Sequence, residues 1–170
     1  MKIPYSIILL IFTLSLLSCK GEDEGTSLDS SAKDWEETKS KEGNNYSYQV
    51  VSQSWTGYGT STTLKVVDGQ VSEREYTAYQ IEEGGDRVIL SEYSESMDSL
   101  GSHDEGAGIY TIDELYDQCE GEYLSVDAAK NTIYFSTFKN GLLQTCGYVP
   151  SNCMDDCFVG FKISLIAFEE

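Results

Sequence analysis

Basic residues are scarce in this chain, and histidine is nearly absent. The 170 residues include 11 Lys and Arg against 29 Asp and Glu, and His103 is the single histidine. The net charge of −18 repels nucleic acid and anionic lipid headgroups, so we expect neither as a partner of the domain surface. No second Cys/His cluster accompanies Cys153 and Cys157 to supply a zinc ligand set, so we expect no structural zinc site, and we expect no cofactor.

No apolar run in the sequence is long enough to cross a membrane. The longest run, residues 7–17, is interrupted by Thr13 and Ser15, and it falls short of the roughly 20 residues that a transmembrane helix needs. It follows Lys2 and ends in Leu16-Leu17-Ser18-Cys19. This length and this basic flank are typical of a signal peptide.

The segment Leu16-Leu17-Ser18-Cys19 resembles the lipobox of bacterial lipoproteins. The resemblance implies cleavage before Cys19, a diacylglyceryl group on its sulfur and an acyl group on its new amine. An ordinary signal peptide that happens to end near a cysteine is the alternative. Several acyl chains on one cysteine give a durable anchor, since each buried methylene contributes about 0.8 kcal/mol. We therefore expect the membrane to be contacted through the lipid anchor only.

The residues after Cys19 bear on localisation in the bacterial cell envelope. Lys20 follows the cysteine where inner-membrane lipoproteins carry Asp, and by the same resemblance this favours the outer membrane. Gly21-Glu22-Asp23-Glu24 resembles the acidic export signals of some surface-exposed lipoproteins. A solvated charged tether is an equally good interpretation.

The sequence predicts three segments. Residues 1–18 form the signal peptide, residues 19–32 the lipidated cysteine with a flexible acidic tether, and residues 33–170 a single domain. About 140 residues are enough for one domain with a real core. Removal of the signal peptide takes away one Lys and no acid, which leaves 10 basic and 29 acidic residues and a net charge of −19.

Alternating patterns and turn pairs predict a domain rich in strands. Strands are expected over residues 46–50, 62–67, 71–81, 88–93, 132–138, 142–149 and 159–168. Asp68-Gly69 and Asn140-Gly141 are typical of tight hairpin turns. In the last strand, alternation places Phe161, Ile163 and Leu165 on one face.

Two helices complete the predicted domain. The first begins at Asp34, directs Trp35 to the core and ends at Gly43-Asn44. Thr111 and Glu114 form a capping-box pattern at the start of the second. Its apolar face consists of Ile112, Leu115, Tyr116, Cys119 and Tyr123. The predicted class is α+β, an antiparallel sheet of six to seven strands with two helices packed on one face, in the order αββββαβββ.

Four cysteines remain once Cys19 is set aside. An even number in an exported chain predicts two disulfides, with three possible pairings of Cys119, Cys146, Cys153 and Cys157. One pairing joins Cys153 to Cys157 within one turn and leaves Cys119 for Cys146. The main rival joins Cys146 to Cys157 and leaves Cys153 for the helix. We favour the first because its short bridge is local, although the sequence leaves the others open.

Two short segments contain residue types used in catalysis or metal binding. Ser102-His103-Asp104 holds the residues of a catalytic triad, but neighbours in sequence rarely converge as a triad requires, so we interpret it as a solvated loop. Asp155 and Asp156 are weak candidates for a calcium site, because calcium needs six to eight oxygen ligands and none are spaced around them. We predict no catalytic residue.

Aromatic residues are abundant, with 11 tyrosines and both tryptophans after the signal peptide. We expect Tyr46 and Tyr134 in the core. Trp55, Tyr58 and Tyr76 are expected at a turn or on an outer face, where a displayed patch would suit sugar or protein binding. Ordinary strand formation is the favoured interpretation of these aromatics.

Several segments between Trp35 and Phe168 resemble, in their order and spacing, a bacterial domain of unknown function found in secreted proteins and lipoproteins. The segments are Trp35, Asn45-Tyr46-Ser47-Tyr48, Val66-Val67-Asp68-Gly69-Gln70-Val71, Tyr110-Thr111-Ile112-Asp113-Glu114-Leu115-Tyr116-Asp117 and Asp155-Asp156. The resemblance implies a fold and no activity. The chain departs from that family at its cysteine-bearing segment, where the family usually has a Gly-Tyr-Pro turn without disulfides.

These observations lead to one functional expectation and one alternative. The expectation is a non-catalytic, lipid-anchored module that binds an unknown protein or glycan in the envelope or outside the cell. The alternative is an inhibitor of a secreted hydrolase such as a lysozyme or a protease, because an acidic surface suits a cationic enzyme. That alternative rests on analogy at the level of the fold.

Overall fold

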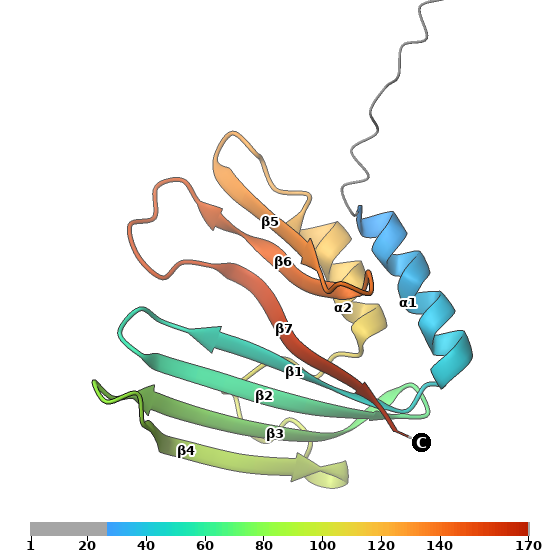
Figure 1. The fold of residues 1–170 in the computed structure, drawn as a ribbon, viewed down its shortest axis with the longest axis horizontal. Helices are drawn as coiled ribbons and strands as arrows, with labels where there is room; N and C mark the ends of the chain where they lie inside the picture. Colours follow the sequence, from blue (N-terminus) through green and yellow to red (C-terminus); the bar gives the residue numbers. More distant parts are fainter. Residues whose placement is uncertain (1–26, 170) are drawn as a thin grey trace, which may run out of the picture.

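A computed structural model describes residues 27–169 and shows a seven-stranded antiparallel sheet with two α-helices (Figure 1). This confirms the predicted α+β class. The elements are α1 (Leu28–Glu42), β1 (Tyr46–Gln53), β2 (Tyr58–Val67), β3 (Gln70–Ile81), β4 (Arg87–Ser96), α2 (Ile112–Gln118), β5 (Asn131–Thr137), β6 (Leu143–Pro150) and β7 (Val159–Phe168). Within residues 27–169, no helix is long and apolar enough to cross a membrane. The predicted lipobox with Cys19 and the acidic segment after it lie outside the described residues.

The strand order is β4-β3-β2-β1-β7-β6-β5, so the first and last strands meet in the middle of the sheet. Hairpins connect the other neighbours, and every pairing is antiparallel. The predicted Asp68-Gly69 turn joins β2 to β3 with positive φ angles of 52° and 75°. Two successive positive φ angles are what a tight two-residue hairpin needs, which is why the sequence uses Gly at the second position.

The core lies between the two helices and the middle of the sheet. Trp35 of α1 packs edge to face against Tyr46 of β1, with the ring centroids 5.1 Å apart. The other buried members of this cluster are Tyr48, Leu64, Val66, Ile112, Leu115, Tyr116, Cys119, Leu142, Leu143, Cys146, Phe161 and Ile163. Burial of each large side chain in such a cluster contributes about 1.5–3 kcal/mol to folding.

α1 begins at Leu28, so the helix starts before Asp34 and the expected domain boundary at residue 33 lies inside it. Ser27 caps the helix by accepting a hydrogen bond from the Ser30 amide. Leu28 and Ala32 pack against the core, and Ser31 is fully buried. With Trp35 these residues form a stripe at i, i+3, i+4 and i+7, whose small side chains make it hard to recognise in an otherwise polar segment.

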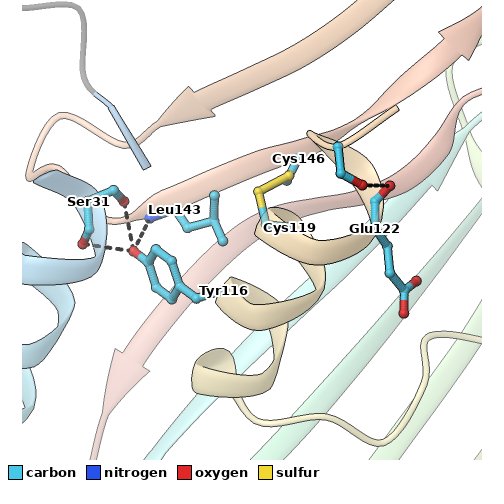
Figure 2. Close-up of a disulfide and its surroundings, with 7 residues drawn as sticks. Ser31, Tyr116, Cys119, Glu122, Leu143 and Cys146 are labelled. Atoms are coloured by element: carbon cyan, nitrogen blue, oxygen red, sulfur yellow. Dashed lines mark hydrogen bonds between the residues drawn. A yellow bond between two sulfur atoms is a disulfide. The ribbon is translucent and has the colours of Figure 1, made fainter. Parts of the chain in front are cut away.

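The buried hydroxyl of Tyr116 connects both helices to the sheet (Figure 2). It donates to the Ser31 carbonyl at 3.0 Å and accepts from the Leu143 amide at 3.1 Å. Beside it, Cys119 is bonded to Cys146 of β6, with 5.7 Å between their Cα atoms. Cys153 and Cys157 form the second disulfide, between β6 and β7. Two disulfides were predicted, and this is the pairing favoured from the sequence.

Three sequence expectations about side-chain placement are wrong. Leu165 is 55 % exposed while Ile163 is buried, because β7 carries a bulge opposite Gln49 and Val50 that shifts the alternation by one residue. Tyr134 is 45 % exposed because it points away from the helices on the edge strand β5. Tyr76 is buried, because the loop between β4 and α2 covers its face of the sheet.

Candidate binding cleft

The long loop between β4 and α2 is fixed to the sheet by a buried ion pair. The Arg74 guanidinium donates to both carboxylate oxygens of Glu95, at 3.0 and 3.1 Å. It also donates to the carbonyls of His103 and Ala107 in the loop, at 2.7 and 3.1 Å. The Glu95 carboxylate in turn accepts from the amides of Gly101 and His103. One buried pair therefore satisfies backbone groups at three points of the loop.

These contacts change the acid–base behaviour of the residues under the loop. Burial alone would raise the pKa of Glu95, but the hydrogen bonds from Arg74, Gly101 and His103 outweigh it and hold that pKa well below its ordinary value. Burial raises the pKa of Tyr76 to about 12. Glu95 is thus ionised and Tyr76 neutral at any pH near 7, as a structural anchor requires.

Ser102 and His103 meet, but not as a catalytic dyad. The Ser102 hydroxyl lies 3.2 Å from Nδ1 of His103, and Oε1 of Glu95 lies 2.9 Å from the same nitrogen. In a catalytic triad the nucleophile and the orienting acid contact opposite ring nitrogens. The His103 ring is also stacked on Tyr93, with centroids 4.0 Å apart. This cluster therefore holds the loop in place, and residues 102–104 are exposed, as expected of a solvated loop.

A cleft opens where β1 and β7 separate in the middle of the sheet. The two strands pair from Tyr46 and Phe168 as far as Val50 and Ile163. Beyond that point, residues 159–162 of β7 pair with β6 on their other edge, and residues 51–53 of β1 pair with β2. The cleft between them has a volume of about 510 Å³, within the range of known ligand sites.

The walls of the cleft come from β1 and β7, from Tyr58, Thr60 and Thr62 of β2, and from the anchored loop. β1 contributes residues 50–53, β7 contributes residues 160–162, and Gly106 and Ala107 of the loop close one side. A side chain at Gly106 would lie 2.9 Å from both Thr62 and Tyr76, so glycine is needed for the loop to lie this close to the sheet. Because the Arg74–Glu95 pair holds this loop on the sheet, it also fixes one wall of the cleft.

Two surface loops meet at the mouth of the cleft. In the β1–β2 turn, Ser54 donates to a carboxylate oxygen of Asp156, and Nε1 of Trp55 donates to Asp155 at 3.0 Å. Both aspartates belong to the β6–β7 loop, which the Cys153–Cys157 disulfide closes. Among the described residues no group of three potential ligands is arranged to hold a metal ion. The carboxylates are instead used to hold the two loops together.

The mouth also displays apolar side chains. Trp55 is 78 % exposed and Met154, in the disulfide-closed loop, is fully exposed. Tyr58 lines the cleft and is 41 % exposed. Of the aromatics expected at a turn or an outer face, Trp55 and Tyr58 lie there as predicted. The sequence indicated where these two aromatics lie, but not that two loops 100 residues apart converge beside them.

The cleft lies at the end of the sheet remote from the start of α1. β6 begins at Leu143, beside Ser31 in the first turn of α1. It runs eight residues to the β6–β7 loop, a distance of roughly 25 Å at the usual rise of a strand. In Figure 1 this loop and the β1–β2 turn lie on the left and both helices on the right.

Comparison with models of protein families, with curated proteins and with solved structures finds no match for this chain.

Proposed function

We propose that this chain is a lipid-anchored, non-catalytic binding module of the bacterial cell envelope, and that the β1–β7 cleft is its binding site. The observation that carries the proposal is the separation of two central strands into a cleft with an exposed aromatic mouth. Exposed aromatic side chains are enriched where proteins bind partners.

The arrangement of the domain supports an orientation in which the mouth of the cleft points away from the membrane. We assign both helices and the anchored loop to one face of the sheet, within the element order αββββαβββ. The end of the sheet that holds the cleft is then left open. The polypeptide enters the domain at Ser27, beside the far end of β6. An anchor at Cys19 would therefore leave the mouth of the cleft directed away from the membrane, toward partners in the periplasm or outside the cell.

The anchor itself is tested by replacing Cys19 with alanine. We expect Cys19→Ala to abolish incorporation of labelled fatty acid and to leave the signal peptide uncleaved by the lipoprotein peptidase, because the thiol is the acceptor of the diacylglyceryl group. Metabolic labelling followed by electrophoresis measures both. Label in the variant equal to that in the wild type would remove the anchor from the proposal.

The binding role is tested by capturing partners from envelopes with matched surface variants. We expect the wild-type chain to retain a discrete partner, and the double variant Tyr58→Ala/Lys162→Glu, which alters the cleft, to lose at least about nine-tenths of it. The control Tyr134→Ala/Lys139→Glu makes the same chemical changes at exposed positions that do not line the cleft, and its contact with the cleft wall is the Tyr134 ring against Phe158. Equal loss in both variants, or retention in the cleft variant, would contradict the assignment of the cleft.

A second candidate function has its own observation. Met154 and Trp55 protrude from loops that a disulfide and two side-chain hydrogen bonds hold rigid, with carboxylates beside them. A rigid apolar tip with adjacent negative charge suits the active-site groove of a cationic hydrolase. Assays against lysozymes and proteases test this, and uniform inactivity would remove the inhibitor from consideration.

A further inference from the structure

The cleft is bounded at both of its ends. β1 and β7 pair at Val50 and Ile163, and hydrogen bonds between the β1–β2 turn and the β6–β7 loop close the other end. Residues 51–53 of β1 lie between these two ends. A ligand of the cleft is therefore short, and it is held by the side chains that line the cleft.

Uncharged hydrogen-bonding groups dominate this lining. The residues that provide them are Ser52, Gln53, Ser54, Tyr58, Thr60 and Thr62. The charged residues of the lining are Asp156 and Lys162, and each already has a contact within the site. Asp156 accepts a hydrogen bond from Ser54, and the Lys162 ammonium lies 5.0 Å from the centre of the Phe158 ring. Such a lining suits a ligand that is neutral and rich in hydroxyl groups.

Aromatic rings accompany these polar groups in the cleft. Tyr58 lines it from β2, and Phe158 and Phe161 line it from the side of β7. A sugar ring has an apolar face of C–H groups and an edge of hydroxyl groups. Aromatic rings and hydroxyl-bearing side chains in one cleft therefore match both kinds of surface of a sugar.

We propose that the cleft binds a short neutral oligosaccharide. This rests on the function proposed above and names its ligand class. The net charge of −18 repels acidic polysaccharides, which is why the ligand is neutral. The two closed ends of the cleft limit the ligand to a few sugar units, either free or at the end of a longer glycan.

A side pocket determines which substituent the sugar carries. It has a volume of about 220 Å³ and shares Val50, Ala107 and Phe161 with the cleft. From there it extends toward Leu115 and the half-buried Gln118 of α2. Apolar walls beside an amide side chain match an acetamido group, because its methyl group is apolar and its N–H and C=O need hydrogen-bond partners. We therefore expect an N-acetylated sugar to bind more tightly than the same sugar with a hydroxyl group.

Screening on an array of neutral and acidic glycans tests the ligand class. The full chain is purified in a detergent without a sugar headgroup, so that the detergent does not compete for the cleft. We expect neutral glycans to retain the chain and acidic glycans not to retain it. Retention by no neutral glycan, or by acidic glycans alone, overturns the proposal. If the cleft variant then still loses the envelope partner, the binding module stands and the cleft is assigned to a protein.

Calorimetric titration with two matched trisaccharides tests the side pocket. Triacetylchitotriose and cellotriose share their backbone and differ in the acetamido group, which replaces a hydroxyl group in each unit. We expect triacetylchitotriose to bind at least about fivefold more tightly, because the acetamido group adds hydrogen bonds and an apolar contact. Equal affinity, or tighter binding of cellotriose, overturns the role of the side pocket.

Matched variants of Tyr58 locate the sugar in the cleft. Tyr58→Ala removes the aromatic ring, whereas Tyr58→Phe keeps the ring and removes its hydroxyl group. We expect Tyr58→Ala to weaken the binding of triacetylchitotriose at least about tenfold and Tyr58→Phe less than about threefold. Affinities equal to that of the wild type in both variants overturn the assignment of the sugar to the cleft.

The variant Gln118→Leu separates recognition of the substituent from the stability of the fold. Leucine is a good helix former and keeps the wall of the side pocket, but it removes the amide. We expect Gln118→Leu to weaken the binding of triacetylchitotriose about fivefold and to change that of cellotriose less than about twofold. A misfolded variant would lose both sugars equally. An equal loss of both, or no loss of either, contradicts the acetamido site.

Discussion

Replacing Arg74 with methionine is expected to lower the free energy of unfolding by about 3–5 kcal/mol, the largest effect of any polar substitution in this domain. Arg74 is 3 % exposed and holds the carboxylate of Glu95, which is 1 % exposed. The variant would leave that charge buried without its partner, and the carbonyls of His103 and Ala107 without their donor. Chemical denaturation followed by circular dichroism measures the change.

The double variant Arg74→Met/Glu95→Leu is the control for this prediction. Removal of both charges is expected to be less damaging than Arg74→Met alone, because no unpaired charge stays buried. The loop amides of Gly101 and His103 would still lose their acceptor, so recovery is expected to be partial. A double variant less stable than Arg74→Met would contradict this account of the pair.

Stability is expected to depend on pH through the same carboxylate. The folded pKa of Glu95 is lowered, so its contribution is fully present above the ordinary carboxylate pKa of about 4.3. It is lost progressively as the pH falls below that value toward the lower folded pKa. Wild-type unfolding measured between about pH 5 and pH 2 should show this loss, and Arg74→Met should show less of it.

Removal of the Cys119–Cys146 disulfide is expected to destabilise the domain more than removal of Cys153–Cys157. The first bond closes a loop of 27 residues and the second one of 4. The chain-entropy model gives about 3–4 kcal/mol for the first and about 2 kcal/mol for the second. The first bond also joins the turn after α2 to β6 within the core (Figure 2).

Paired serine variants measure this difference by thermal unfolding without reductant. Cys119→Ser/Cys146→Ser is expected to lower the melting temperature by about 10 °C, and Cys153→Ser/Cys157→Ser by about half as much. The second pair is also expected to loosen the mouth of the cleft, because its loop holds Asp155 and Asp156. Equal shifts, or a larger shift for the short loop, would contradict the role assigned to the helix-to-sheet bond.

Local signals account for the parts of the fold that the sequence predicted. The turn at Asp68-Gly69 and the capping box of Thr111 and Glu114 depend on residues within three positions of each other, and both are present as predicted. The start of α1 and the exposure of Leu165 were missed for different reasons. The start of α1 has a local cap at Ser27, but its buried stripe consists of small side chains in a polar segment, and the exposure of Leu165 depends on a bulge against the distant strand β1.

The cleft was beyond sequence reasoning because it arises from the sheet as a whole. Nothing in the alternation of β7 indicates that its first half pairs with β6 while its second half pairs with β1. One part of the site did leave a signal. Arg74 pairs with the buried Leu64 of β2 and lies two residues from the buried Tyr76 on β3, and a charged residue on such a buried face predicts a buried partner such as Glu95.

Photo-crosslinking in intact cells tests the central claim most directly. A photoreactive phenylalanine analogue at Tyr58 places the probe in the cleft, and the same analogue at Leu90 places it on the exposed edge strand β4. We predict a discrete protein or glycan adduct from position 58 and none from position 90. No adduct from position 58, or the same adducts from both positions, would contradict a binding module whose site is the cleft between β1 and β7.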